Sequence, residues 1–181
     1  MEIREFYKSW NLKSFNSSEF IDQCNQHDLI IIGGGNFLEL KWDYSTTGTT
    51  IDISIETLKK IEPPIVFNLL GVDDYKGTST KNLVRFKQFI EYLGFKKKYF
   101  LSVRNDGSKK NLIRLYGDEF SNLFIEGPDC GFFARYEKKR PIYLSNNKKY
   151  IGVNITYDFL SIRFPYEFSY EDFITDLAST L

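Results

Sequence analysis

Residues 28–36 read DLIIIGGGN, an uninterrupted apolar run that three glycines close. Such a run, with no polar alternation, is typical of a strand buried on both faces, as in a parallel sheet. Residues 65–70 read IVFNLL and stop at Gly71, so they form a second run of the same kind. Two such strands separated by a helix signal predict an α/β domain.

Helix signals separate the expected strands from one another. Residues 16–18 (Asn-Ser-Ser) and Ser54 are suitable N-caps for two helices. The clearest helix opens at residues 78–79 (Thr-Ser) and ends at Gly94, a natural stop. Its apolar residues recur at helical spacing and are Leu83, Phe86, Ile90 and Leu93.

The same alternation continues through the rest of the chain. Ser169 and Asp172 form a capping box for a last helix. A short helix is expected at residues 108–116, and further strands are expected at residues 99–103, 122–125 and 150–155.

This order predicts an α/β fold with an open, mostly parallel Rossmann-like sheet and helices on both faces. We expect one domain over residues 1–181, with its core at about residues 16–156. Residues 157–181 would be a linker and a C-terminal helix that lead into a missing second domain. Residues 45–50 (STTGTT) are expected to form an exposed loop because of their turn-forming, hydroxyl-rich composition.

Charge and hydropathy exclude several classes of function. The chain has 24 basic and 24 acidic side chains, so no overall field attracts nucleic acid. Its densest basic run, residues 96–98, is interpreted as a solvated turn because a nucleic-acid surface needs a wider basic face. No apolar stretch has the length of a signal-peptide core or a membrane span. We therefore expect a cytoplasmic location, with the cytoplasmic face of the membrane as the more specific alternative.

The two cysteines, Cys24 and Cys130, do not form a disulfide scaffold, and neither has a CxxC neighbour. The single histidine, His27, precedes the first strand and so falls at the opposite end of the sheet from Cys130. A Cys-His nucleophile is therefore not expected, and neither is a thiol-bound metal.

Ligands of doubly wound sheets bind beyond the carboxyl ends of the strands, where this chain has four loops to consider. In the first loop, Gly33 to Asn36, glycines permit a close backbone approach, and a following helix would point N–H groups at an anion. The spacing is not GxGxxG, and no clear acidic ribose partner follows about 20 residues later, so an NAD site is not expected. The alternative is that these glycines only make a tight turn.

The second and third loops carry charge. Residues 71–74 (Gly-Val-Asp-Asp) have two acids that either bind sugar hydroxyls or a metal, or simply solvate a turn. Because no further oxygen ligands are near, no metal is proposed. In the third loop, Arg104 leaves a strand end and can form a forked contact with a carboxylate or phosphate. The competing interpretation is a pair between Arg104 and Asp106 that rigidifies the turn, with Asp106 or Ser108 capping the next helix.

The fourth loop, residues 126–131, reads EGPDCG. Asp129 lies directly after the expected strand, where a carboxylate could serve as a general base. The alternative is that Asp129 is a helix cap or a hydrogen-bond anchor.

Taken in order, the strand-end segments of this chain resemble the polysaccharide pyruvyl transferase family. Members typically have a strand ending in a glycine triplet, a "kPvv…G" strand, an "sVRD-x-S" turn, a "v-PDp" turn and a "vgvn" strand. Each element alone is a weak signal, and the ordered set covers residues 28–156. The matching segments are DLIIIGGGNFLEL, PPIVFNLLGVDD, FLSVRNDGSKKNL, LFIEGPDCGFF and YIGVNIT.

The resemblance implies a two-domain enzyme of the glycosyltransferase B type, of which this chain is similar to the N-terminal half. Such enzymes transfer pyruvate from phosphoenolpyruvate, a co-substrate, to a sugar of a cell-surface polysaccharide or its lipid-linked precursor. A histidine and arginines of the second domain would bind phosphoenolpyruvate. The family's acid is shifted one place here, by Asn105. By the family pattern the ligand-binding cleft would be lined by Gly33, Gly34, Gly35, Asn36, Gly71, Arg104, Asp106, Ser108 and Asp129.

Several alternatives stay open at this point. The chain is expected to be incomplete for catalysis unless a second domain or a partner chain completes it, and its catalytic residues are unknown. A role in exopolysaccharide or cell-wall biosynthesis follows only from the resemblance. The competing functions are a non-catalytic sugar- or nucleotide-binding domain, and a part of a glycosyltransferase that uses a nucleotide sugar.

Overall fold

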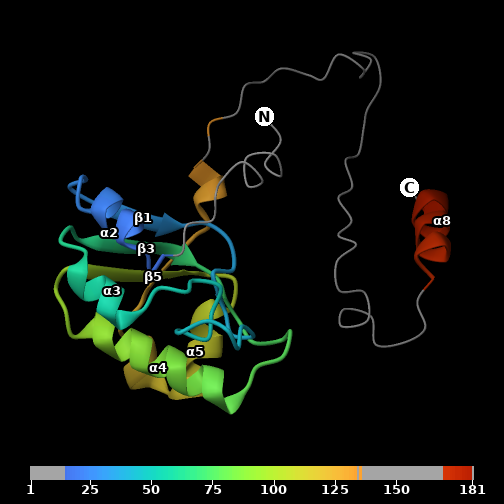
Figure 1. The fold of residues 1–181 in the computed structure, drawn as a ribbon. Helices are drawn as coiled ribbons and strands as arrows, with labels where there is room; N and C mark the ends of the chain where they lie inside the picture. Colours follow the sequence, from blue (N-terminus) through green and yellow to red (C-terminus); the bar gives the residue numbers. More distant parts are fainter. Residues whose placement is uncertain (1–14, 134, 136–168, 181) are drawn as a thin grey trace. The chain divides into compact units, whose positions relative to one another are not determined.

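The structure is a computed structural model that describes residues 15–133, residue 135 and residues 169–180 (Figure 1). The chain divides into two compact units, Met1–Ala134 and Arg135–Leu181. The described strands belong to the first unit, and the second contributes helix α8 (Tyr170–Thr180).

The main sheet has four parallel strands, β1 (Ile30–Gly33), β3 (Ile65–Leu70), β5 (Tyr99–Arg104) and β6 (Ile125–Gly127), in that spatial order. A smaller parallel pair joins β2 (Leu38–Glu39) to β4 (Val72–Asp73) just beyond the ends of β1 and β3. The predicted α/β class with an open, mostly parallel sheet is confirmed. The small β2–β4 pair was not predicted, because two-residue strands carry no periodic signal.

The helices between the strands gather on one side of the sheet. They are α3 (Ile55–Lys60), α4 (Thr80–Gly94), α5 (Ser108–Tyr116) and the short α6 (Asp118–Ser121). The strands follow one another across the sheet in chain order, and parallel crossovers are right-handed, so successive connections return on the same face. Figure 1 shows α3, α4 and α5 on one side of β1, β3 and β5, with α2 (Ser18–Cys24) beside β1.

The core lies between these helices and the sheet face they cover. Phe67 of β3 meets Phe89 of α4 edge to face, with ring centroids 6.0 Å apart and an interplanar angle of 84°. Leu101 of β5, Leu93 of α4 and Leu112 of α5 are buried in the same cluster. Each fully buried side chain of this size contributes about 1.5–3 kcal/mol relative to an exposed one.

The N-terminal helix caps predicted from the sequence are present. Ser17, Ser54 and Ser79 are the N-caps of α2, α3 and α4, and each side chain accepts a hydrogen bond from a backbone N–H of the first turn. Ser169 accepts from the backbone N–H of Asp172 at 3.2 Å, which confirms the predicted start of α8. Helix α4 ends at Gly94, as predicted.

Two local predictions are wrong. Residues 122–125 were expected to be a strand, but β6 begins at Ile125, because α6 and a turn occupy the residues before it. Residues 45–50 were expected to be exposed, but Ser45, Thr47 and Thr49 are buried. Their hydroxyls hydrogen-bond one another at 3.0 and 2.9 Å, so the polar groups are satisfied without water. The expected strand at residues 150–155 lies outside the described residues.

Candidate functional site at the carboxyl end of the sheet

Because the four main strands are parallel, their carboxyl ends meet at one edge, and the loops predicted to carry ligands meet there too. Arg104 is the last residue of β5 and stands at the centre of this edge. We call Asn36, Arg104, Asp106 and Asp129 the Arg104 cluster.

The guanidinium of Arg104 has three protein partners from three different loops. Its Nη1 donates to Asp129 Oδ2 at 3.1 Å, and its Nη2 donates to Asn36 Oδ1 at 2.6 Å. The same Nη2 lies 2.8 Å from Asp106 Oδ2. The Nε of Arg104 is buried and has no hydrogen-bond partner among the described residues. The pair between Arg104 and Asp106 is therefore present, as in the interpretation in which it rigidifies the turn.

Asp106 also connects the cluster to the backbone of the neighbouring strand. Its Oδ1 accepts hydrogen bonds from both the N–H and the hydroxyl of Ser108. The Ser108 hydroxyl in turn accepts from the backbone N–H of Val72 at 2.9 Å. The Ser108 hydroxyl thus donates to Asp106 and accepts from Val72, and it holds the β5 loop against β4. Gly107 is the N-cap of α5, so the cap predicted at Asp106 or Ser108 is one residue off in position.

Gly71 provides the space in which Asn36 and Arg104 meet. A Cβ at this position would overlap the Asn36 amide oxygen and would lie 2.5 Å from Arg104 Nη2. The backbone of Gly71 also joins two loops, because its N–H donates to Gly35 O at 3.0 Å and its carbonyl accepts from Leu38 N at 3.2 Å. A side chain at position 71 would therefore force the ends of the Asn36 and Arg104 side chains to move.

The glycine triplet makes a turn that is not followed by a helix. Gly34 and Gly35 have φ angles of 84° and 73°, in the left-handed region that favours glycine. The chain continues into the short strand β2. The expectation that a helix after the triplet would aim N–H groups at an anion is therefore wrong, and the tight-turn interpretation describes the local geometry.

Asp129 is held from two sides. Its Oδ1 accepts from the Gly131 N–H at 2.7 Å, while its Oδ2 accepts from Arg104. These two donors, with the Gly131 N–H contributing most, lower the pKa of the Asp129 carboxyl. The carboxylate therefore stays ionised at neutral pH, and its present role is the hydrogen-bond anchor that sequence offered as the alternative to a general base.

The charge of the site follows from its composition. Asn36 Nδ2 donates to Asp73 Oδ2 at 3.4 Å, so a third carboxylate adjoins the two that pair with Arg104. Two carboxylates therefore pair with the guanidinium of Arg104, and the third adjoins the cluster through Asn36. The Arg104 cluster together with Asp73 is net negative. Such an edge is unfavourable for an added anion and rich in acceptors for hydroxyl groups. About half of the Asp106 and Asp129 side-chain surface, 42% and 50%, is open to solvent.

Next to the cluster, Leu69 has a φ of 50°, although it is not a glycine. The β3–β5 register shifts between Phe67 and Leu70, and the Ser102 hydroxyl accepts from Leu69 N at 2.8 Å. Backbone strain of this kind costs about 1–3 kcal/mol and is concentrated at functional sites. Nothing in the IVFNLL run predicts it.

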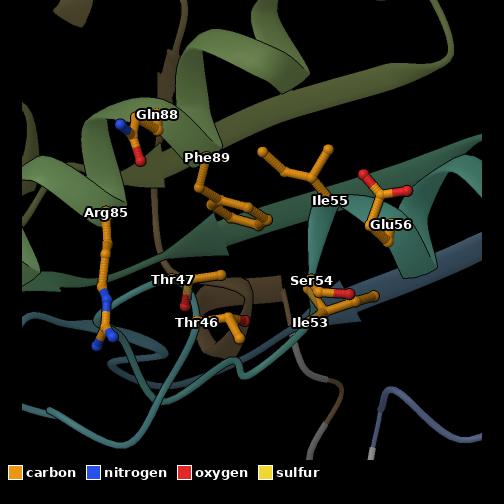
Figure 2. Close-up of a pocket in the computed structure, with 9 residues that line it drawn as sticks. All are labelled: Thr46, Thr47, Ile53, Ser54, Ile55, Glu56, Arg85, Gln88 and Phe89. Atoms are coloured by element: carbon orange, nitrogen blue, oxygen red, sulfur yellow. The ribbon is translucent and has the colours of Figure 1, made fainter.

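A separate pocket of about 140 Å³ lies between the N-terminal part of α3, the helix α4 and residues 46–47 (Figure 2). Its charged side chains are already engaged with the protein. Arg85 Nη1 donates to the carbonyls of Asp43 and Ser45 at 2.8 and 3.0 Å, and Glu56 pairs with Lys59 at 2.7 Å. The pocket therefore presents few convergent polar groups to a ligand.

The described residues also bear on other chemistries. Within residues 15–133 and 169–180, no helix is long and apolar enough to cross a membrane. The same ranges contain no group of three or more His, Cys, Asp or Glu residues that could hold a metal ion.

Cys24 and Cys130 are free thiols, and burial raises the pKa of Cys24. Cys130 Sγ accepts from Asn68 Nδ2 at 3.4 Å.

No protein-family model, curated protein or solved structure matches this chain.

The structure thus brings most of the residues singled out from sequence to one edge. Asn36, Gly71, Arg104, Asp106 and Asp129 form one contact network, with Ser108 behind Asp106. Gly33 lies beside Asn68, which supplies the atoms nearest to a Cβ at that position. Leu69 was missed. Asp73 was considered as one of the two acids of the second loop but was not included in the expected cleft, because nothing in sequence indicated that it would meet Asn36.

Proposed function

We propose that this chain is the acceptor-binding, Rossmann-like half of an enzyme similar to the polysaccharide pyruvyl transferases. Under this proposal, the complete two-domain enzyme transfers pyruvate from phosphoenolpyruvate to a sugar of a cell-surface polysaccharide. The observation that carries the proposal is the convergence of Asn36, Arg104 and Asp129, from three separate loops, at the carboxyl end of the sheet.

The chemistry of the edge supports the acceptor side rather than the phosphoenolpyruvate side. Phosphoenolpyruvate is an anion and calls for unpaired cations, whereas Arg104 is already compensated by Asp106 and Asp129. A sugar presents neutral hydroxyl groups that can donate to carboxylate and amide oxygens. In this proposal a histidine and arginines of a second domain or a partner chain bind phosphoenolpyruvate. The reaction then takes place in the cytoplasm, at its membrane face when the acceptor is lipid-linked.

The experiment is saturation-transfer difference NMR on the chain with a panel of methyl glycosides of galactose, glucose and N-acetylmannosamine. Arg104→Met is compared with the control Arg114→Met. The control also removes an arginine that pairs with an aspartate, Asp74, but this pair lies outside the Arg104 cluster. The proposal expects glycoside signals that Arg104→Met removes and Arg114→Met retains. Absence of any glycoside signal from the wild-type chain would contradict it.

A second candidate is a part of a nucleotide-sugar glycosyltransferase, which is separated by adding uridine diphosphate and phosphoenolpyruvate to the same panel. Binding of uridine diphosphate, with protection of the fold by the nucleotide and none by phosphoenolpyruvate, would favour that function. The net negative charge of the strand-end edge argues against it, because a diphosphate would face Asp73, Asp106 and Asp129.

A further inference from the structure

Exposed aromatic side chains lie just beyond the small β2–β4 pair. Tyr44 is 68% exposed, and its ring lies against that of Trp42, with centroids 5.5 Å apart and an interplanar angle of 56°. Tyr75 is 73% exposed. Trp42 and Tyr44 follow β2, and Tyr75 follows β4, so all three come after the carboxyl ends of two neighbouring parallel strands. We call Trp42 and Tyr44 the aromatic platform.

The indole of Trp42 is held in one orientation. Its Nε1 donates to Glu39 Oε2 at 3.0 Å, and Glu39 is buried. The other oxygen of this carboxylate pairs with Lys76 Nζ at 2.8 Å. Lys41 Nζ lies 4.7 Å from the centroid of the Trp42 ring. Because these contacts fix the ring before a ligand arrives, little conformational freedom is lost when one binds.

The register of the β2–β4 pair places the anchor of the platform beside the Arg104 cluster. Leu38 pairs with Val72, and both are buried in the core. The next residues, Glu39 and Asp73, also pair with each other. Since successive side chains of a strand alternate between its faces, Glu39 and Asp73 lie side by side on the face away from Leu38 and Val72.

Asp73 joins the two features through its own contacts. Its Oδ2 accepts from Asn36 of the Arg104 cluster at 3.4 Å, and its Oδ1 accepts from the Tyr75 N–H at 2.9 Å. Its neighbour Glu39 holds Trp42. Asn36 and Glu39 are separated by at most about 11 Å of extended backbone. A short oligosaccharide can therefore reach both the Arg104 cluster and the platform.

The combination of aromatic faces and oxygen acceptors suits a sugar. A pyranose ring has an apolar face of C–H bonds and a rim of hydroxyl groups. The negative face of an aromatic ring attracts such C–H bonds, and carboxylate oxygens accept from hydroxyls. A nucleobase would also stack on these rings. Its phosphates, however, would face the net negative charge of the Arg104 cluster with Asp73, so a saccharide is favoured over a nucleotide.

We propose that the aromatic platform is a second saccharide subsite, so that the acceptor is an oligosaccharide rather than a single sugar. One sugar unit binds at the Arg104 cluster, and a neighbouring unit of the same oligosaccharide stacks on Trp42 and Tyr44. The inference rests on the proposed function for the first unit. It adds that acceptor length, and not only the identity of one sugar, determines affinity.

The test compares two disaccharides, methyl β-cellobioside and methyl β-lactoside, with the methyl glycosides of their terminal sugars, glucose and galactose. Dissociation constants are measured by amide NMR titration of the full chain. We expect the disaccharides to have up to about tenfold lower Kd, the size of effect that an aromatic contact provides. Tyr44→Ser should raise the disaccharide Kd to the monosaccharide value and leave the monosaccharide Kd unchanged.

Two further variants serve as controls. Tyr44→Phe keeps the ring and should keep the tighter disaccharide binding. Phe95→Ala removes an aromatic side chain that is 86% exposed and lies between α4 and β5, at the amino end of the sheet, so it should change neither Kd. Trp42 stays in place in all of these variants, because it bonds to the buried Glu39. Since Tyr44 is mostly exposed, its replacement should not disturb folding.

Trp42 also reports directly on the platform. The chain has two tryptophans, so Trp10→Phe leaves Trp42 as the only one. In this variant the disaccharides should change the Trp42 emission, whereas the monosaccharide glycosides should not. Adding Tyr44→Ser should abolish the response.

The outcomes separate this inference from the proposed function. Equal Kd values for disaccharides and monosaccharides, or a disaccharide advantage that survives Tyr44→Ser or is lost equally in Phe95→Ala, would overturn the subsite while leaving the Arg104 cluster as a sugar site. A Tyr44-dependent disaccharide response that Arg104→Met leaves intact would support the platform and contradict the proposed function. Binding of neither length of glycoside would contradict both.

Discussion

The two ends of the parallel sheet use polar side chains in different ways. At the amino end, side chains bond to backbone: Lys98 Nζ donates to the carbonyls of Leu58 and Ile61, and Tyr99 Oη donates to Leu58 O at 3.1 Å. At the carboxyl end, side chains also bond to one another, as Arg104 does with Asn36 and Asp129. Contacts to backbone fix the fold, whereas half-exposed contacts between side chains can be exchanged for contacts to a ligand. This difference is the reason why we propose the carboxyl end as the ligand-binding end.

The largest effect is expected from Gly71→Ala at the carboxyl end. The added methyl group overlaps the Asn36 amide and displaces Arg104, so overpacking should lower the free energy of unfolding by about 1–3 kcal/mol. Glycoside binding should be lost as well. Gly33→Ala is the control, since a Cβ there meets its nearest atoms at 3.5 Å and needs no movement. Urea unfolding of both variants measures the difference, and equal stabilities would show that Gly71 is not required by close approach.

The next effect is expected at the amino end, from Lys98→Met. This change removes two hydrogen bonds from a charged donor to the C-terminal carbonyls of α3, which should cost about 1.5–3 kcal/mol. Burial lowers the pKa of Lys98, so the ammonium carries a desolvation cost that places the loss at the lower end of this range. Glycoside binding should stay unchanged. A variant that loses binding while keeping its stability would break the proposed division between the two ends.

Arg104→Met is expected to abolish glycoside binding while changing the stability little, the opposite of the result expected for Lys98→Met. Its carboxylate partners are about half exposed and can be solvated by water once the guanidinium is gone, so stability should fall by no more than about 1 kcal/mol. Binding should nevertheless disappear. Thermal melts alongside the NMR titration separate the two readouts. A loss of several kcal/mol, comparable to a broken buried pair, would make Arg104 a structural residue and remove the main support for the site.

The smallest effect concerns the pH dependence of Asp129. Its pKa in the folded chain lies below its ordinary value of 3.8, because the Gly131 N–H and then Arg104 favour the carboxylate. These contacts add stability that is present above pH 3.8 and is lost as pH falls through the lowered pKa. The difference in melting temperature between wild type and Asp129→Asn should therefore be small at pH 6 and should vanish at lower pH. A difference that grows as pH falls would contradict the assigned direction.

The features that sequence predicted well are those set by neighbouring residues. The IVFNLL strand was placed at its observed bounds, and Ser54 and Ser79 cap the expected helices, because apolar runs and capping side chains act locally. Residues 45–50 were misplaced for the opposite reason. Hydroxyl-rich composition favours exposure, and only the folded chain shows that Thr47 and its neighbours satisfy one another while buried.

The site was predictable in location but not in its contacts. Parallel topology alone directs the loops after β1, β3, β5 and β6 to one edge, which is why Arg104 and Asp129 were found. The bond between Arg104 and Asn36 joins residues 68 positions apart and depends on the missing side chain of Gly71, which no local pattern encodes. The left-handed φ of Leu69 is likewise a product of the register shift between β3 and β5.

The central claim, that the carboxyl end of the sheet binds a saccharide, is tested most directly by backbone amide NMR of the ¹⁵N-labelled chain during titration with the glycoside panel. The account predicts shifts for the amides of residues 33–36, Gly71, residues 104–108 and Asp129, with those of Lys98 and Tyr99 unmoved. Shifts confined to the pocket around Thr46 and Arg85 (Figure 2), or no shift at the carboxyl end with any member of the panel, would contradict it.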